Sequence, residues 1–113
     1  MRRFLLIVLL AIALLISTFI SPALATETSN GAKLFSANCA SCHIGGGNIL
    51  IAEKNLTKEA LSKYLIDDGD LIQAIIHQVQ NGKNAMPAFK GKLSEEEIVE
   101  VATYVLEQAE QGW

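Results

Sequence analysis

The sequence predicts an all-α domain of four helices that follows a separate N-terminal segment. Apolar residues recur at intervals of three and four in several stretches, and no stretch alternates apolar with polar residues over the length of a strand. The apolar residues are also unevenly distributed, because residues 1–25 hold 19 of them and residues 26–113 hold 38. A domain the length of residues 26–113 buries only about 60–65 % of the surface that its unfolded chain exposes. We therefore expect a cofactor, a metal or a disulfide to complete its core.

The charge balance excludes several classes of protein. The chain of 113 residues has a formal net charge of −3, and residues 26–113 carry seven lysines and twelve acidic residues. A mildly acidic chain lacks the basic surface that nucleic-acid binding needs, so we predict no nucleic-acid partner. With 50 % hydrophobic and 19 % charged residues, the composition is also unlike that of a disordered protein.

The N-terminal segment has the three parts of a secretory signal peptide. Two arginines supply a positive start, residues 4–16 form an unbroken apolar run, and the segment ends in a small-x-small pattern at Ala25. We predict cleavage after Ala25, so that residues 1–25 are a signal peptide and residues 26–113 form the domain, outside the cytoplasm and without stable membrane insertion. Residues 18–20 can extend the run into an uncleaved anchor, and the arginine pair allows twin-arginine export, but both are weaker alternatives.

The first two helices of the domain are predicted on either side of a glycine-rich loop. The first runs from Ser29 or Asn30 to Asn38 and places Gly31, Leu34 and Phe35 on one face. Gly45-Gly46-Gly47-Asn48 then interrupts the helical pattern, and glycine there permits close approach to a flat cofactor. The second helix runs from Lys58 to about Leu65, with Thr57 as its N-cap.

The last two helices have clear stop and start signals. Asp68 or Asp70 begins the third helix, which Asn81-Gly82 ends. The fourth helix begins at Ser94, where Ser94 and Glu97 form a capping box. It places these apolar residues at helical spacing: Ile98, Val101, Ala102, Val105 and Ala109. Trp113 follows this helix, and the sequence does not decide whether it packs back or frays.

The strongest chemical signal is Cys39-Ala40-Ser41-Cys42-His43, a Cys-x-x-Cys-His motif. This is the attachment signature of a c-type haem. On a helical turn the positions i, i+3 and i+4 share one face, so two thiols and an imidazole project together. Cys39 and Cys42 can then form thioethers with the haem vinyl groups while His43 reaches the iron from the same side. We predict one covalently bound haem.

Two other interpretations of the motif are weaker. A Cys39–Cys42 disulfide or redox dithiol suits an exported protein, but such a motif usually lies in a βαβ context that this chain lacks. A zinc site needs four ligands, and Cys39, Cys42, His43 and His77 do not have the paired spacing of zinc ligands.

The second axial ligand of the iron is predicted to be Met86. It is the only methionine after residue 25, and it lies in a segment rich in turn residues. Pro87 keeps Met86 out of helical geometry, which places the thioether on an extended loop. His77 is the alternative for bis-histidine ligation. It falls off the apolar stripe of the third helix, so a solvated position is the simpler interpretation.

Together these residues resemble the class I cytochromes c and, within them, the cytochrome c6 family. The resemblance is carried by Gly31-Ala32-x-Leu34-Phe35, Cys39-Ala40-x-Cys42-His43, Gly45-Gly46-Gly47-Asn48, Asn81-Gly82-Lys83-Asn84-Ala85-Met86-Pro87-Ala88-Phe89 and Val101-Ala102-x-Tyr104-Val105-Leu106. It implies a four-helix class I cytochrome c fold around one covalently bound haem c. It also implies that Gly31 and Phe35 cross the last helix near Tyr104, and that Gln78 lies near the haem.

The resemblance implies a carrier of single electrons and not an enzyme. Members of the family carry an electron from the cytochrome b6f complex, through cytochrome f, to photosystem I in the thylakoid lumen. A periplasmic location with a terminal oxidase as acceptor, or service to a haem enzyme, is the alternative. We expect a monomer.

Lysines gather in sequence around the predicted Met86 loop. Lys83, Lys90 and Lys92 can form a positive face that steers an acidic partner, although an ordinary solvated surface explains them equally well. Many members of the family have arginine where this chain has Lys92. Lysine offers a point charge instead of a planar fork, so the resemblance leaves the strength of docking open.

Overall fold

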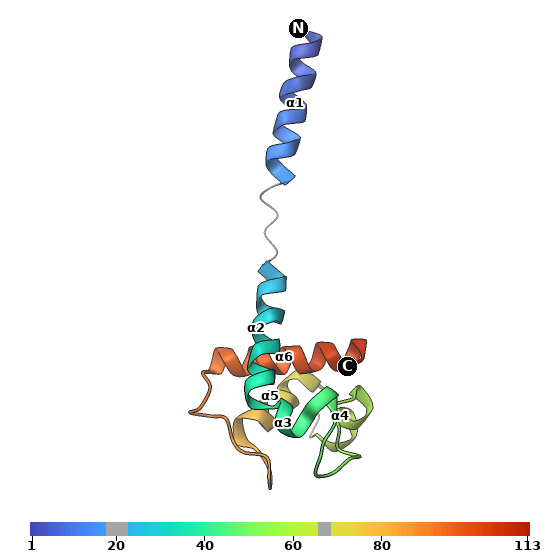
Figure 1. The fold of residues 1–113 in the computed structure, drawn as a ribbon, viewed down its shortest axis with the longest axis vertical. Coiled ribbons are helices and arrows are strands. Elements are labelled where there is room, and N and C mark those ends of the chain that lie inside the picture. Colours follow the sequence, from blue (N-terminus) through green and yellow to red (C-terminus); the bar gives the residue numbers. More distant parts are fainter. Residues whose placement is uncertain (18–22, 66–68) are drawn as a thin grey trace.

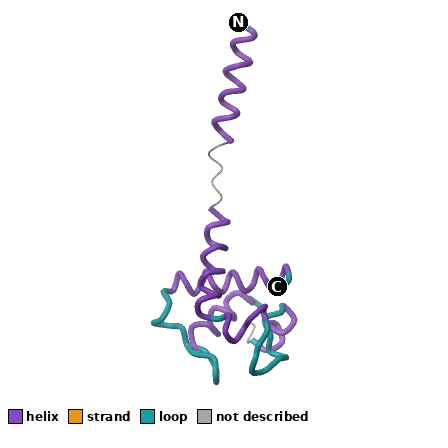
Figure 2. The backbone as a smooth tube through the Cα atoms, in the orientation of Figure 1, coloured by secondary structure: helices purple, strands orange, loops and turns teal. Residues whose placement is uncertain are grey.

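The computed structural model describes residues 1–17, 23–65 and 69–113, and over these residues the chain is helical without a strand (Figures 1 and 2). The elements are α1 (Arg2–Ser17), α2 (Ala23–Asn38), α3 (Ala40–His43), the 3-10 turn η1 (Ile44–Gly46), α4 (Lys58–Tyr64), α5 (Leu71–Asn81) and α6 (Glu95–Gln111). Within the described ranges, backbone pairing of the strand type is limited to two isolated bridges, Lys83 with Met86 and Lys90 with Leu93. The predicted all-α class is confirmed.

The N-terminal helix α1 lies apart from the other helices (Figure 1). Its apolar side chains face outward, with Phe4 74 % and Ile7 66 % exposed. Among the described residues, no helix combines the length and the apolar character that crossing a membrane requires. The predicted cleavage after Ala25 stays a prediction.

The helix α2 begins earlier than predicted. It starts at Ala23 and not at Ser29 or Asn30. Sequence periodicity placed the start at the first residue of the apolar face that includes Gly31, Leu34 and Phe35. No proline follows residue 22 until Pro87, so nothing in the sequence between residues 23 and 30 forces the helix to stop.

The crossing of α2 over α6 depends on Gly31. A Cβ atom at Gly31 would lie 2.6 Å from the carbonyl oxygen of Glu100 and 2.8 Å from Cβ of Tyr104, so a larger residue would push the helices apart. One turn later the Phe35 and Tyr104 rings pack with centroids 5.4 Å apart. The crossing that the resemblance implied is confirmed.

The core lies where α2, α4 and α5 meet α6. Its largest fully buried side chains are Ile98 and Val101, and the predicted face of α6 is buried from Ile98 to Val105. The other core residues are Phe35, Leu61, Ile75, Val79, Phe89 and Ala102. Leu56 and Ala109 pack against this cluster and are half-buried.

The predicted starts of α4, α5 and α6 agree with the observed caps. The Thr57 hydroxyl accepts a hydrogen bond from the Ala60 N–H at 3.2 Å, and Ser94 with Glu97 completes the capping box of α6. Asp70 is the N-cap of α5, although its side chain makes no capping hydrogen bond. The alternative start, Asp68, lies outside the described residues.

Candidate functional site

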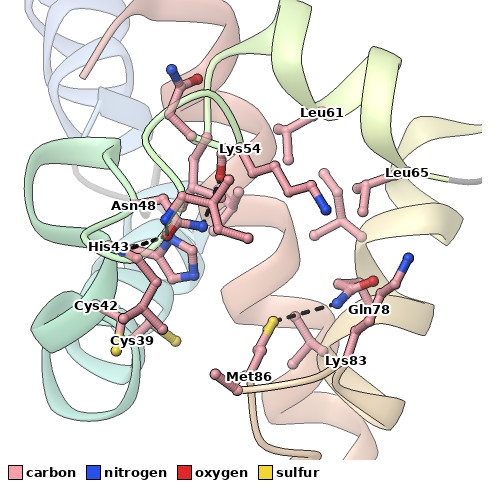
Figure 3. Close-up of a pocket in the computed structure, with 18 of the residues that line it drawn as sticks. Cys39, Cys42, His43, Asn48, Lys54, Leu61, Leu65, Gln78, Lys83 and Met86 are labelled. Atoms are coloured by element: carbon pink, nitrogen blue, oxygen red, sulfur yellow. Dashed lines mark hydrogen bonds between the residues drawn. The ribbon is translucent and has the colours of Figure 1, made fainter.

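A cavity of about 300 Å³ lies between α3, α4, α5 and the loop that precedes α6 (Figure 3). Most of the side chains around it are apolar, including Phe35, Leu50, Ile51, Leu56, Leu61, Leu65, Ile75, Val79, Phe89, Val101 and Val105. The cavity therefore lies inside the hydrophobic core. Its polar residues come from a few short segments, which define two walls.

The first wall is the predicted haem-attachment motif. The His43 N–H donates to the Cys39 carbonyl at 3.0 Å, which closes one helical turn and brings Cys39, Cys42 and His43 to one side of the cavity (Figure 3). The His43 Nδ1 atom lies 2.8 Å from the Gly47 carbonyl oxygen. A carbonyl only accepts, so Nδ1 carries the proton and donates. In the neutral imidazole this arrangement leaves the lone pair on Nε2, the atom that a metal-ligating histidine then offers.

The loop after His43 is organised by Asn48, a role that sequence reasoning missed. The Asn48 Oδ1 accepts from the N–H groups of Leu50 and Ile51 at 3.0 and 2.9 Å, and Nδ2 donates to the Lys54 carbonyl at 3.0 Å. One side chain thus stabilises the segment from Asn48 to Lys54, which lies along the cavity. Asparagine often supplies such turns, and its place directly after three glycines was the available signal.

The cysteines favour attachment of a cofactor over thiol redox chemistry. Burial raises the pKa of the Cys39 thiol to about 11, so this thiol is protonated at neutral pH. A redox dithiol needs the opposite shift, because the thiolate is the nucleophile. Cys39 and Cys42 are not joined in a disulfide. In the part of the chain that the structure describes, no three His, Cys, Asp or Glu side chains are grouped as a metal-ion site.

The second wall is the loop of residues 82–89. Lys83 and Met86 exchange two backbone hydrogen bonds of 3.0 Å each, so the loop is a tight turn with Met86 at its end, half-buried at the cavity. Gln78 on α5 also lines the cavity, and its Nε2 donates to the Met86 sulfur at 3.5 Å. In Figure 3, Met86 and Gln78 lie across from Cys39, Cys42 and His43.

The turn that carries Met86 depends on Gly82. Its φ of 63° and ψ of −177° belong to a region that only glycine adopts readily. A Cβ atom there would also overlap the Met86 carbonyl and the Pro87 backbone. Gly82 therefore both ends α5 and lets the loop fold back over the cavity.

His77 does not reach the site. It is exposed on α5, one residue before Gln78, and it is not among the residues that line the cavity. Successive residues on a helix point about 100° apart, which separates the two side chains. The interpretation of His77 as a solvated helix residue is confirmed, and bis-histidine ligation finds no support.

Comparison with known proteins decides the family. Residues 26–105 match the protein family described as cytochrome C oxidase, cbb3-type, subunit III. Cytochrome c6 of Thermosynechococcus vestitus is 55 % identical over 99 % of this chain and 96 % of its own length, and that of Nostoc sp. is 55 % identical over 100 % and 99 %. The chain belongs to the cytochrome c6 family. It is thus a c-type cytochrome with one covalently bound haem c, and it is an electron carrier and not an enzyme.

Solved structures of cytochrome c6 proteins have the same fold. Cytochrome c6 of the diatom Phaeodactylum tricornutum matches with a TM-score of 0.72 at 55 % identity, over 76 % of this chain and 98 % of that one. Cytochrome c6C of Synechococcus sp. PCC 7002 matches with a TM-score of 0.66 at 44 % identity, over 74 % and 99 %. The four-helix class I cytochrome fold predicted from the sequence is confirmed.

The residues around the cavity fit a cytochrome c6 haem. The motif wall offers two thiols and an imidazole with a free Nε2, and the opposite wall offers a thioether. Between them, apolar side chains provide the surface that a flat macrocycle needs. Among the described residues, no buried side-chain nitrogen or oxygen lacks a partner, so the lining demands no further polar ligand.

The predicted lysine cluster lies beside the second wall. Lys83 lines the cavity, and Lys83, Lys90 and Lys92 are all exposed. The Lys92 ammonium lies 5.7 Å from the centre of the Phe89 ring, a cation–π contact that holds it near the loop. Lys54, which the sequence did not single out, adds a half-buried positive charge at the cavity.

Proposed function

We propose that this protein carries single electrons from the cytochrome b6f complex, through cytochrome f, to photosystem I. In this proposal residues 1–25 are removed as a signal peptide, and the domain of residues 26–113 works as a monomer in the thylakoid lumen. The observation that carries the proposal is the placement of His43 and Met86 on opposite walls of one apolar cavity. A pair of axial ligands without an open position suits electron transfer and not turnover of a substrate.

The proposed residue roles follow from the two walls. Cys39 and Cys42 form the thioethers, and His43 and Met86 are the axial ligands of the iron. The haem supplies a site that stores one electron. His43 is oriented by the Gly47 carbonyl, and Met86 is a soft ligand that favours the reduced state. Gln78 donates to the Met86 sulfur, which reduces electron donation from that sulfur and thereby raises the potential.

Contact with redox partners is proposed at the open edge of the cavity. Leu50 and Ile51 line the cavity and are 64 % and 40 % exposed, and Pro87 on the other wall is exposed as well. Small apolar surfaces with a charged border suit brief encounters, because they exclude water at the contact without holding the partner. Lys83, Lys90 and Lys92 form the charged border and steer an acidic partner.

A terminal oxidase is the second candidate acceptor. The family matched by residues 26–105 is described by an oxidase subunit, and the chain is 53 % identical to a protein of Nostoc sp. named cytochrome c6-like, nearly as similar as to its cytochrome c6. Fold and haem alone suit either acceptor. The choice therefore depends on kinetics.

The deciding experiment compares electron-transfer rates from the reduced protein to isolated photosystem I and to a terminal oxidase. We expect fast, salt-sensitive transfer to photosystem I and at least tenfold slower transfer to the oxidase. The reverse order would replace photosystem I by the oxidase as acceptor. Comparable slow rates with both would contradict the proposal.

The steering role of the lysines has its own matched variants. Lys83→Glu and Lys92→Glu reverse charges beside the Met86 wall, whereas Lys58→Glu makes the same change at the exposed start of α4. At low salt the first two variants should lower the rate with photosystem I several-fold, and high salt should remove the difference. Rates equal to that of Lys58→Glu would show that the lysines are only a solvated surface.

A further inference from the structure

Trp113 packs back onto the domain, which resolves the choice that the sequence left open. Gly112, with φ of 97° and ψ of 142°, ends α6 and turns the chain. The Trp113 ring then lies 5.1 Å from the Phe35 ring and 6.0 Å from the Tyr104 ring, measured between centroids. Trp113 thereby joins the aromatic cluster at the crossing of α2 and α6 and is only 37 % exposed.

Trp113 also holds both ends of the segment that runs from Gly46 to Leu56. Its indole Nε1–H donates to the Leu56 carbonyl at 2.8 Å. Gly46 is buried against the indole ring, and a Cβ atom at Gly46 would overlap that ring. The Leu56 N–H donates in turn to the Gly46 carbonyl at 2.7 Å, so indole, Gly46 and Leu56 form one contact.

The next residue along the chain connects this contact to the haem side. Gly47 follows Gly46 directly, and its carbonyl accepts the His43 Nδ1–H at 2.8 Å. The Gly47 N–H is itself bound to the Ile44 carbonyl at 3.0 Å. The peptide unit between Gly46 and Gly47 is planar, and hydrogen bonds at both of its ends, to the Leu56 N–H and to the Ile44 carbonyl, hold that plane in place. The Cα atom of Gly47 ends this plane, so the position of Gly46 sets the point from which the Gly47 carbonyl extends toward His43.

We infer that Trp113 is a positioning residue for His43: the indole fixes Gly46, and through Gly46 it fixes the Gly47 carbonyl that orients the imidazole. The inference rests on the proposed role of His43 as axial ligand. The group that accepts a hydrogen bond from the other ring nitrogen of a metal-bound imidazole fixes the plane of the ring and raises its basicity. Trp113 acts indirectly, on the backbone segment that carries the Gly47 carbonyl.

The test uses the haem-loaded protein with Trp113→Leu and Trp113→Phe. Leucine removes both the donor and the flat ring, whereas phenylalanine keeps a ring against Gly46 and removes only the donor. The measurements are the electron paramagnetic resonance spectrum of the oxidised protein, which reports the ligand planes, and the solvent exchange of the His43 Nδ1 proton by NMR. Ile98→Val is the control, because it weakens the core of α6 at a residue that does not line the cavity.

We expect Trp113→Leu to shift the resonance spectrum and to speed exchange of the Nδ1 proton about tenfold, the scale of losing one well-formed hydrogen bond. Trp113→Phe should recover most of the parent spectrum, and Ile98→Val should leave spectrum and exchange unchanged despite lower stability. If Trp113→Leu matches the parent in both measurements, or if Ile98→Val shifts them equally, the inference is wrong. A parent protein without a histidine–methionine spectrum would instead contradict the axial assignment in the proposed function.

Discussion

The two walls of the cavity hold their candidate ligands in different ways. His43 lies in the same five-residue motif as both cysteines, and its imidazole donates a hydrogen bond of 2.8 Å to Gly47. Met86 lies on a separate loop, and its sulfur accepts a hydrogen bond of 3.5 Å from Gln78. The first wall is thus built from neighbours in sequence, whereas the second is completed by a loop that folds back onto α5.

This difference indicates which of the two candidate ligands is held more weakly. The His43 side is held by a closed helical turn, by the Asn48 hydrogen bonds and by Trp113. The Met86 side depends on the Lys83–Met86 backbone pair and on the conformation of Gly82. If Met86 and His43 are the ligands proposed above, we expect the Met86 ligand to be lost before the His43 ligand.

The largest effect is expected for His43→Ala. Removing the imidazole deletes the ligand beside the two attachment thiols, so the yield of haem-containing protein should fall at least tenfold. The ratio of haem absorbance to protein measures this yield. His77→Ala removes an exposed histidine from α5 and should leave the ratio unchanged. Equal yields for the two variants would contradict the assignment of His43.

Met86→Ala should keep the haem and change its properties. Loss of the soft ligand should lower the reduction potential by on the order of 0.2 V, within the roughly 0.8 V range that axial ligands span. The open position should also bind added imidazole or cyanide. Met86→Leu preserves most of the side-chain volume and should behave in the same way. An unchanged potential and spectrum in both variants would exclude Met86 as ligand.

Gly82→Ala tests how far the Met86 wall depends on backbone geometry. Strain at φ of 63° together with the overlap at Met86 should cost about 3 kcal/mol of unfolding free energy. Gly91→Ala is the matched control, because Gly91 has φ of 87° but no atom within 4 Å of its added Cβ, so only about 1 kcal/mol is expected. Denaturant unfolding of the haem-loaded proteins measures both. Equal losses would show that the overlap at Gly82 relaxes freely.

The smallest effect is expected for Gln78→Leu. Without the N–H donor the sulfur donates more fully, so the potential should fall by on the order of 0.05 V, the equivalent of about 1 kcal/mol for one electron. Gln80→Leu changes the same side chain on α5 at a residue that does not line the cavity, and its potential should match that of the parent. A redox titration separates the two. Equal potentials for the two variants would show that Gln78 does not influence the reduction potential.

Local patterns in the sequence sufficed for the motif wall and for most helix boundaries. Cys39, Cys42 and His43 need only one helical turn to come together, and caps such as Thr57 and Ser94 act within three residues. These interactions are short in sequence, so residue type and spacing determine them. Met86 could also be predicted as the second ligand, because Pro87 and the absence of another methionine after residue 25 left few alternatives.

The remaining features connect residues that are distant in sequence. The contact of Gln78 with the Met86 sulfur requires the turn at Gly82, and the contact of Trp113 with Leu56 joins residues 57 positions apart. The predicted start of the first helix, at Ser29 or Asn30, was wrong, because α2 begins at Ala23, before the apolar periodic pattern on which the prediction relied. The sequence by itself determined the helical class, the cofactor and the starts of α4, α5 and α6. Only the tertiary structure decided how the loop of residues 82–89 and Trp113 are placed relative to the motif wall. Such contacts depend on packing between distant residues and not on their spacing in the sequence.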